Sequence, residues 1–309
     1  MSILVVGSVA LDTVKTPYGE IEDALGGAAT YFAAAASYFA QVNLVGVVGD
    51  DFDHNQIEFL KSRNVDLTGL ERQTGKTFRW GGVYSNDMND RETTFTHLNV
   101  FESFSPKIPE SYRDSEYIFL ANIAPELQLD VLKQVHSPKL VALDTMNFWI
   151  EGALPALQEV LGKVDILLIN DSEAKQLAGE NNLVKAARAI HKMGPKTLII
   201  KKGEHGALLI PNDMNFFVAP AYPLETVFDP TGAGDTFAGG FMGYLARTNS
   251  INKESLSQAL IAGSAMASLC VEKFSLERLK DLTGAQIHGR VQEFSKMMHF
   301  DADGAGFNL

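Results

Sequence analysis

DPTGAGDTFAGGF, residues Asp229 to Phe241, is the stretch of this sequence that says most about its fold. Within it, the tripeptide Gly232–Gly234 comes directly before a helix-like run whose apolar side chains share one face: Phe237, Phe241, Tyr244 and Leu245. Glycines let successive backbone N–H groups converge on one point, and a helix N-terminus adds a partial positive charge. We therefore predict a turn that binds an anion such as a phosphate and opens a helix.

Asp235 lies in the first turn of that helix, beside the predicted anion site. A hydroxyl that attacks phosphorus must lose its proton, and a carboxylate placed there can accept it, which contributes about 10²–10⁴-fold to the rate. Glycines alone fit equally well with a turn needed only for tight helix–sheet packing. The aspartate directly after them favours phosphoryl transfer, with Gly232, Ala233 and Gly234 binding the charge that develops on the transferred group.

Three further glycines, Gly239, Gly240 and Gly243, fall inside the predicted helix. Each costs roughly 1 kcal/mol relative to alanine in a helix interior. We therefore expect another element to pack directly against the backbone of this helix. Two other phosphate-binding motifs are missing: the chain has no GxxxxGK[ST] and no GxGxxG after its first apolar run, which counts against a Walker-type NTPase and a simple dinucleotide enzyme.

Outward from this stretch, short apolar runs alternate with amphipathic segments such as 126–135 and 182–193. The runs are Ile3–Val6, Leu44–Val48, Tyr117–Leu120, Leu140–Leu143, Ile166–Ile169, Leu198–Ile200 and Ala207–Ile210. Near-continuous apolar strands that alternate with helices indicate a mostly parallel sheet covered on both faces.

Residues Thr77–Thr96 break this rhythm, because they form two extended arms around the polar run SNDMND at Ser85–Asp90 and have no helix of their own. The pattern predicts a β-hairpin. Together with Val14–Ala24, we expect it to form a small β appendage that can close over a binding site.

The composition argues against several classes of function. The net charge is −12, so the chain lacks the basic surface of a nucleic-acid-binding protein. Cys270 is the only cysteine, and the seven histidines show no spacing typical of a zinc site. No apolar run is long enough to cross a membrane and no basic segment precedes the first one, so we expect a cytoplasmic protein without a membrane partner.

The stretch Asp229–Phe241 resembles the C-terminal motif of the ribokinase-like, or phosphofructokinase B, family of carbohydrate and nucleoside kinases. The resemblance covers essentially the whole chain. It implies an α/β fold, a three-layer α/β/α sandwich with a mostly parallel central sheet, as one kinase domain over residues 1–309. It also implies a small β-sheet lid formed by about 13–24 and 74–104.

For the motif itself, the resemblance implies that Asp235 is the catalytic base and that Gly232–Gly234 form the anion hole. It implies Mg²⁺ with ATP as the cofactor. Asp229 and Thr231 would lie near a monovalent cation such as K⁺, in members of the family that use one.

On the acceptor side, GSVALD ends with Asp12, and the segment beginning LGG supplies Gly26 and Gly27; both resemble sugar-binding elements of the family. Asp12 can accept hydrogen bonds from two hydroxyls, although an aspartate at this point is also a common turn or cap residue. The family pattern GGxxxN usually has an asparagine where this chain has Tyr31. A phenol cannot reproduce the paired donor and acceptor of a carboxamide, so the acceptor can differ from ribose or fructose.

Two more residues are candidates for contact with the acceptor. Asn147 belongs to DTMNFW, which partly resembles a DxNxR segment of the family, but the arginine has no match here. The lid carries Lys76, Arg79 and Arg91, which can meet an anionic acceptor or remain solvated. Of these, Arg79 between Phe78 and Trp80 is our candidate to face the acceptor.

On the nucleotide side, NDSEA resembles the NxxE motif of the family, which implies that Asn170 contacts the phosphates and that Glu173 holds Mg²⁺ through water. Helix capping by Asn170 with a solvated Glu173 is the alternative. KKGEHG resembles a nucleotide-binding turn, and GSAMASLCVEKF occupies the place of the adenine-side helix. These segments imply further ATP contacts at Lys201, Lys202, Gly203, Gly206 and Ser264.

The sequence thus predicts an ATP-dependent carbohydrate kinase, a phosphotransferase that acts on a hydroxyl of a sugar or sugar-like small molecule. A nucleoside kinase, for which Tyr31, Phe32 and Trp80 offer aromatic surfaces, and a phosphosugar kinase are alternatives on the same fold. A catalytically silent ligand-binding protein is the alternative from another class, although the presence of both Asp235 and the NxxE motif argues against it. A homodimer formed through the lid is also left open.

Overall fold

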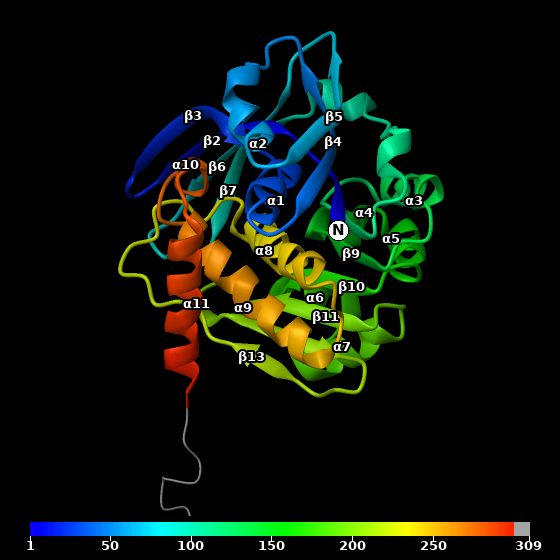
Figure 1. Ribbon diagram of the computed structural model, residues 1–309, viewed down its shortest axis with the longest axis vertical. Coiled ribbons are helices and arrows are strands. Elements are labelled where there is room, and N and C mark those ends of the chain that lie inside the picture. Colours follow the sequence, from blue (N-terminus) through cyan, green and yellow to red (C-terminus); the bar gives the residue numbers. More distant parts are fainter. Residues whose placement is uncertain (300–309) are drawn as a thin grey trace, which may run out of the picture.

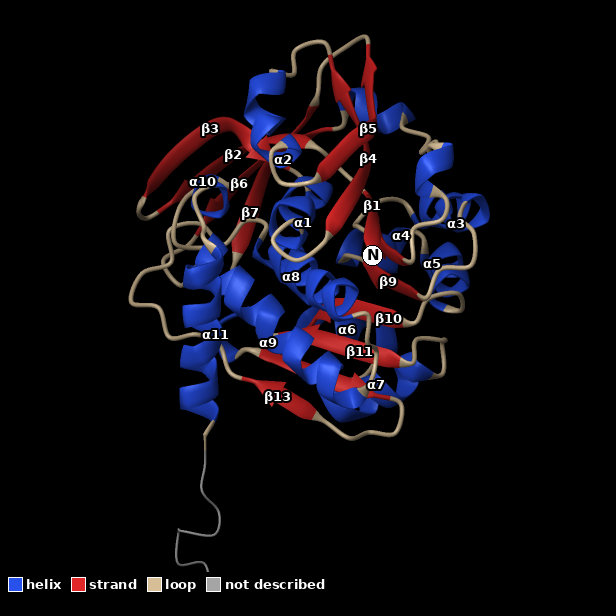
Figure 2. Cartoon of the chain, viewed as in Figure 1, coloured by secondary structure: helices blue, strands red, loops and turns tan. Residues whose placement is uncertain are grey.

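The larger of two sheets forms the centre of the molecule, whose computed structural model describes residues 1–299 (Figures 1 and 2). It has nine strands in the order β13-β12-β11-β10-β9-β8-β1-β4-β5. All neighbours from β11 to β5 pair in parallel, whereas β12 pairs in antiparallel register with both β11 and β13. The strands are β1 (Ser2–Val6), β4 (Gln41–Gly49), β5 (Val65–Gln73), β8 (Tyr117–Leu120), β9 (Leu140–Asp144), β10 (Ile166–Asn170), β11 (Thr197–Lys201), β12 (Ala207–Pro211) and β13 (Phe217–Ala219).

Every strand predicted for this sheet is present, whereas β5 and β13 were not predicted. β5 reads VDLTGLERQ and is only partly buried at the edge of the sheet, so it lacks the continuous apolar run of a central strand. β13 has three residues, too few for any sequence period to appear.

The side chains of each central strand alternate between two hydrophobic cores. In β1, Ile3 and Val5 belong to one core while Leu4 and Val6 belong to the other. One core is covered by α1 (Ala28–Ala36), α8 (Ala233–Thr248), α9 (Lys253–Cys270) and α11 (Gly284–Met298). The other is covered by α3 (Pro125–Gln134), α5 (Leu154–Leu161), α6 (Asp171–Ala178) and α7 (Leu183–His191). Short helices complete the chain: α2 (Glu58–Lys61), α4 (Asn147–Gly152) and α10 (Glu277–Lys280). The predicted three-layer α/β/α sandwich is confirmed.

Helix α8 lies between α1 and α9, and Figure 1 shows these helices beside one another on the same face of the sheet. A Cβ at Gly239 would lie 2.4 Å from the carbonyl oxygen of Phe32 in α1. A Cβ at Gly240 would lie 2.9 Å from the carbonyl oxygen of Ala262 in α9. The glycines inside α8 therefore allow two neighbouring backbones to approach it, as the sequence predicted.

The smaller sheet has four strands in the order β3-β2-β6-β7: β3 (Gly19–Gly26), β2 (Ala10–Thr16), β6 (Phe78–Tyr84) and β7 (Arg91–His97). The predicted hairpin is confirmed, because β6 and β7 pair in antiparallel register. The sheet contains parts of both segments predicted as a lid but begins earlier, at Ala10. Its action as a lid and as a dimer contact stays a prediction, and the predicted domain extends to residues 300–309, outside the described part.

Among residues 1–299, no helix combines the length and the apolar character needed to cross a lipid bilayer.

Candidate active site

The turn that opens α8 has a backbone that only glycine fits. Gly232 caps the helix with φ = 73°, in the left-handed region. A Cβ at this position would also lie 2.4 Å from atoms of the Tyr31 ring. The Ala233 N–H donates to the Pro230 carbonyl at 3.2 Å, whereas the Gly234 N–H, in the first turn of α8, has no intrahelical acceptor. The predicted glycine turn is therefore present as a helix N-terminus whose backbone rests on Tyr31, and anion binding by it stays a prediction.

Tyr31, predicted to contact the acceptor, is itself buried. Its side chain is only 2% exposed, and its hydroxyl has no hydrogen-bond partner among residues 1–299. Burial raises the pKa of this phenol, and the negative charges of Asp229 and Asp12 add to the shift. The hydroxyl is thus held protonated near two carboxylates while the ring supports Gly232.

Asp235 stands in the first turn of α8, and its carboxyl is perturbed in a way that suits proton transfer. Burial raises the pKa of Asp235 to about 7, and the negative charge of Asp144 pushes it in the same direction. The positive charges of Lys201 and Arg91 oppose this shift. A carboxyl with a pKa near neutrality can both accept and release a proton at physiological pH.

Lys201 lies beside this carboxyl at the end of β11. Its Nζ is 3.2 Å from Asp144 Oδ2, and a Cβ at Gly234 would lie 3.0 Å from the same Nζ. Burial alone would lower the pKa of Lys201, but the charges of Asp144, Glu173 and Asp235 outweigh it and raise the pKa instead. The ammonium is therefore charged and lies against the anion-binding turn.

Asn170 and Glu173 form a capping box at the start of α6. The Oδ1 atom of Asn170 accepts a hydrogen bond from the Glu173 N–H at 2.8 Å, and the Asn170 N–H donates to Glu173 Oε2 at 3.0 Å. Burial raises the pKa of Glu173, and so does the charge of Asp144. Helix capping, the alternative weighed from the sequence, is thus real, but Glu173 is not a simply solvated residue.

Asp12 joins the same group from the smaller sheet. Its carboxylate lies directly against Gly26, where a Cβ would be 1.9 Å from Oδ2, and it accepts a hydrogen bond from the backbone of Gly27. Burial raises the pKa of Asp12 to about 7 despite that hydrogen bond, and the charges of Asp229 and Asp235 add to the effect. Two glycines therefore let the carboxylate of β2 approach the start of α8.

The face of the smaller sheet that carries Asp12 also carries an aromatic side chain. Asp12 and Trp80 are paired in register between β2 and β6, so their side chains point to the same side. The Trp80 ring lies over Gly82, where a Cβ would be 2.3 Å from it. The Arg91 guanidinium of β7 stands 5.2 Å from the ring centroid of Trp80. This face thus presents a carboxylate, an indole and a guanidinium side by side.

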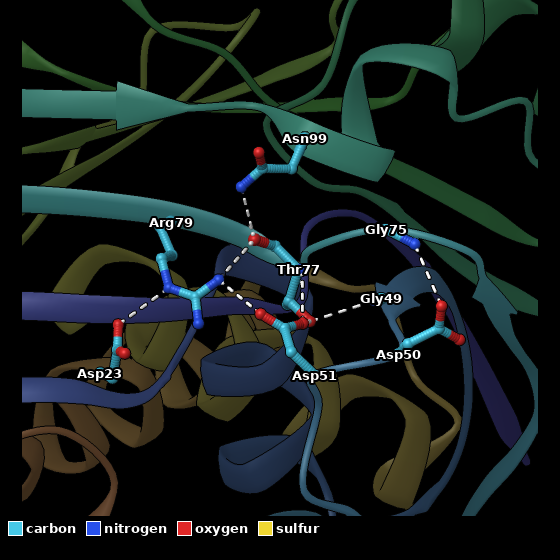
Figure 3. A network of polar contacts seen from close by, with 8 residues as sticks. All are labelled: Asp23, Gly49, Asp50, Asp51, Gly75, Thr77, Arg79 and Asn99. Carbon is cyan, nitrogen blue, oxygen red and sulfur yellow. Dashed lines mark hydrogen bonds and ion pairs between the residues drawn. The ribbon is translucent and has the colours of Figure 1, made fainter.

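Arg79, predicted to face the acceptor, is not part of this group. It precedes Trp80 in β6 and so points to the opposite face of the sheet. Figure 3 shows its guanidinium between Asp23, at 3.0 Å, and Asp51, at 2.7 Å. Burial would raise the pKa of Asp51, but hydrogen bonds from Thr77 and Arg79 outweigh it and hold the pKa below its usual value. Arg79 therefore joins the smaller sheet to the loop after β4.

The smaller sheet also contacts the anion-binding turn and the segment Lys201–Gly206. The Thr231 hydroxyl donates a hydrogen bond to the buried Tyr84 hydroxyl of β6 at 3.1 Å. Beyond the end of β6, the Asn89 amide donates to Glu204 Oε1 at 3.3 Å. The hairpin β6–β7 therefore contacts the turn before α8 through Tyr84 and the loop after β11 through Asn89.

Asp229 is buried, and its two carboxylate oxygens accept one backbone hydrogen bond each. The Thr231 N–H donates to Oδ1 and the Ser275 N–H to Oδ2, both at 2.9 Å. Burial raises its pKa despite these bonds. No ion pair to Asp229 is present within residues 1–299. Its charge is thus left without a protein cation.

Three predicted contact residues show no side-chain hydrogen bond to this group within the described residues. Asn147 is exposed at the start of α4, and the side chains of Lys202 and Ser264 are half-buried; none of the three makes a side-chain hydrogen bond within the described residues. The turn itself is present, since the Lys202 N–H donates to the Gly206 carbonyl at 2.8 Å and Gly203 has a left-handed φ of 53°.

The sequence did not point to Asp144 or Tyr84 as site residues, and it favoured Arg79 over Arg91 as the residue that faces the acceptor. Asp144 had a visible signal, because it follows an apolar strand directly and begins DTMNFW. Tyr84 had none, since a tyrosine in an amphipathic strand gives no sign of which loop it will reach.

Comparison with known proteins identifies the family. The family model described as "pfkB family carbohydrate kinase" matches residues 2–280. A cytidine kinase of Thermococcus kodakarensis is 32% identical over 254 residues, covering 80% of this chain and 89% of that protein. A nucleoside kinase of Methanocaldococcus jannaschii is 24% identical over 287 residues, covering 87% of this chain and 90% of that protein.

The solved structures agree on the fold. A putative ribokinase II from E. coli in complex with ATP and Mg²⁺ superposes with a TM-score of 0.76 at 19% identity, covering 94% of this chain and 99% of that one. Since the family model spans almost the whole described chain and the site contains the motif residues in one group, the chain belongs to the pfkB family of carbohydrate kinases and is an ATP-dependent kinase that phosphorylates a hydroxyl of a sugar-like molecule.

Proposed function

We propose that the acceptor is a nucleoside and that the chain phosphorylates a hydroxyl of its sugar. The observation that carries this proposal is the register of Asp12 with Trp80, which puts a carboxylate for sugar hydroxyls next to an indole and the Arg91 guanidinium. An indole and a planar guanidinium are surfaces on which a base stacks or to which its carbonyl groups bond. The similarity to a cytidine kinase and a nucleoside kinase supports the same acceptor class.

In this proposal Asp12 accepts hydrogen bonds from acceptor hydroxyls and Asp235 receives the proton of the attacking hydroxyl. As the bond from the acceptor oxygen to the γ-phosphorus forms, the bond from that phosphorus to the β–γ bridging oxygen breaks, and ADP leaves with the electron pair. The N–H groups of Gly232–Gly234 bind the charge on the transferred group, and Lys201 adds a positive charge beside Gly234.

The donor set around Glu173 fits Mg²⁺. Only Oε2 of Glu173 is used in the capping box, and magnesium usually binds one or two carboxylates together with phosphates and water. This suits a site where, among residues 1–299, no group of three or more acidic, His or Cys side chains could hold a metal by itself. Bound there with ATP, Mg²⁺ would neutralise phosphate charge, while Asn170 orients Glu173 through their two mutual hydrogen bonds.

Asp229 and Thr231 fit a monovalent cation such as K⁺. The support is the chemistry of Asp229, a buried carboxylate that has backbone donors but no cationic side chain beside it in the described residues. A cation there would stabilise the loop that leads into Gly232. Omission of K⁺ from the assay, with Na⁺ as its replacement, tests this assignment.

Acceptor choice can be tested by an ADP-release screen over nucleosides, free sugars and sugar phosphates, with the Asp235→Asn variant as the blank. We expect nucleosides to give the highest kcat/KM. Trp80→Ala should then raise KM for the nucleoside roughly tenfold or more, the size of a lost base–aromatic stack, and leave KM for any free sugar unchanged. Trp80→Phe is the matched control and should retain most of the affinity.

Three outcomes would contradict the nucleoside proposal. Equal efficiency with ribose and with nucleosides would mean that no base is recognised. A preference for sugar phosphates would instead favour the exposed Arg91 as an anchor for an anionic acceptor, which is the phosphosugar alternative. No ADP release with any of the compounds would favour a silent binding protein.

The pH dependence follows from the raised pKa of Asp235. This carboxyl must be ionised to accept a proton, and burial together with Asp144 raises its pKa to about 7. We therefore expect kcat/KM to fall tenfold per pH unit below about pH 7 and to level off above it. A profile that stays flat down to pH 5 would show that Asp235 is not the group whose ionisation limits the reaction.

A further inference from the structure

Asp144 is a buried carboxylate that the reaction described above does not use. It is the last residue of β9, and its side chain is 9% exposed. One oxygen, Oδ1, accepts a hydrogen bond from the Thr145 N–H at 2.9 Å, and the other, Oδ2, lies 3.2 Å from Lys201 Nζ. Because both oxygens have fixed partners, the carboxylate is held in one orientation.

The partner, Lys201, comes from a strand that is not adjacent to β9. Strand β10 lies between β9 and β11, so Lys201 must reach across about 10 Å, two strand spacings, to meet Asp144. Asn170, the last residue of β10, is in register with Lys201 and belongs to the strand between the two partners. The lysine side chain is thereby laid over the carboxyl ends of the strands instead of extending into solvent.

The ion pair with Asp144 fixes the position of the Lys201 ammonium. Its distance of 3.0 Å from a Cβ built on Gly234 places it against the turn that binds the transferred group. A lysine carries considerable rotamer freedom, and a fixed carboxylate removes it before the nucleotide arrives. We propose that Asp144 is a positioning residue, which holds the Lys201 ammonium against the Gly234 turn so that it meets the phosphoryl group during transfer.

The same pair also sets the electrostatic surroundings of Asp235. The titratable and charged groups that bear on Asp235, or feel its charge, are Asp12 of β2, Arg91 of β7, Asp144 of β9, Lys201 of β11 and Cys270 of α9. Within this set Asp144 raises the pKa of Asp235 and Lys201 lowers it. Removing either member of the pair must therefore move the acidic limb of the pH profile, and in opposite directions.

The experiment compares Asp144→Asn, Asp144→Glu and Lys201→Met, with kcat and KM measured against pH at saturating ATP. We expect Asp144→Asn to lower kcat about tenfold, with little change in KM for the acceptor, and to move the acidic limb to lower pH. Lys201→Met should move the limb to higher pH. Asp144→Glu, which keeps the charge, should recover part of kcat. Because the two residues act as a unit, the double variant should lose less than the product of the two single losses.

Lys196→Met is the matched control, because Lys196 precedes β11 at its opposite end and forms an ion pair with Asp165, at 2.9 Å, just before β10. It should change neither kcat nor the limb. A limb that stays in place in both Asp144→Asn and Lys201→Met, in folded variants with unchanged thermal midpoints, would overturn the positioning role.

This inference rests on the proposed function of Asp235 but can fail separately. If Asp235→Asn abolishes turnover while substitution of Asp144 leaves the acidic limb of the pH profile in place, the base assignment stands and the positioning role is wrong. If Asp235→Asn stays active, the base assignment is wrong. The test uses whichever acceptor the screen identifies, so it does not depend on the nucleoside proposal.

Discussion

Asp235→Asn is expected to lower kcat by about 10²–10⁴-fold, because the amide cannot take the proton of the attacking hydroxyl. The loss should appear in kcat and not in KM for ATP, since the N–H groups of Gly232–Gly234, Lys201 and the Asn170–Glu173 pair are left in place. Turnover by coupled ADP release and ATP affinity by calorimetry, on the same preparation, separate these two effects. Near-normal kcat in this variant would exclude Asp235 as the base.

Thermal stability gives this prediction an internal control. Burial raises the pKa of Asp235 in the folded state above its ordinary value of 3.8, so ionising the carboxyl as pH rises from about 4 through 7 disfavours the folded state. Asparagine removes this penalty. The variant is therefore expected to have a thermal midpoint at pH 8 equal to or above that of the parent chain. A large drop in the midpoint would assign the lost activity to unfolding.

Gly232→Ala is expected to lower kcat by about 10²–10³-fold, the size of the loss when one donor of an oxyanion hole is removed. Alanine disfavours the left-handed φ of 73° found here, and its Cβ would meet the Tyr31 ring at 2.4 Å. Because Tyr31 is packed inside the core, the turn must move instead, and the Gly234 N–H is displaced from its position at the helix N-terminus. Single-turnover kinetics with saturating ATP measure this loss directly.

Gly179→Ala is the matched control for this substitution. Gly179 ends α6 with φ = 64°, nearly the same backbone conformation, but a Cβ there would have no atom within 4 Å. Both variants carry the cost of about 1–2 kcal/mol for alanine in the left-handed region, so both should lower the thermal midpoint. Only Gly232→Ala should lower kcat. Equal kcat in the two variants would show that the contact of the turn with Tyr31 has no role in the reaction.

Much of the site could be predicted from the sequence because its main part is local. The glycines, the helix and Asp235 follow one another within a single stretch, so the turn that positions them is encoded by neighbouring residues. The predicted strands likewise came from continuous apolar runs, which appear wherever a parallel sheet is buried on both faces. Even the close packing of α8 was visible, since glycine inside a helix is costly unless another backbone needs the room.

Arg79 and Arg91 show what the sequence could not settle. The face that a strand residue occupies depends on its register with the neighbouring strand, and a shift by one residue reverses it. A bulge between Gly81 and Gly82 shifts the pairing of β6 with β7, so the position of Arg91 is set by an irregularity that no motif reports. Lys201 and Asp144 are a second case, since their pairing spans a strand and 57 residues of chain.

The exposed strand β7 has a further consequence for redesign of this enzyme. It forms the outer edge of the smaller sheet, pairs only with β6, and contributes no residue to either hydrophobic core within the described chain. Substitutions at such positions usually change the free energy of unfolding by less than about 0.5 kcal/mol. A library randomised at residues 91 and 93 should therefore yield mostly folded variants with altered acceptor preference, whereas one randomised at residues 31 and 232 should yield few folded members.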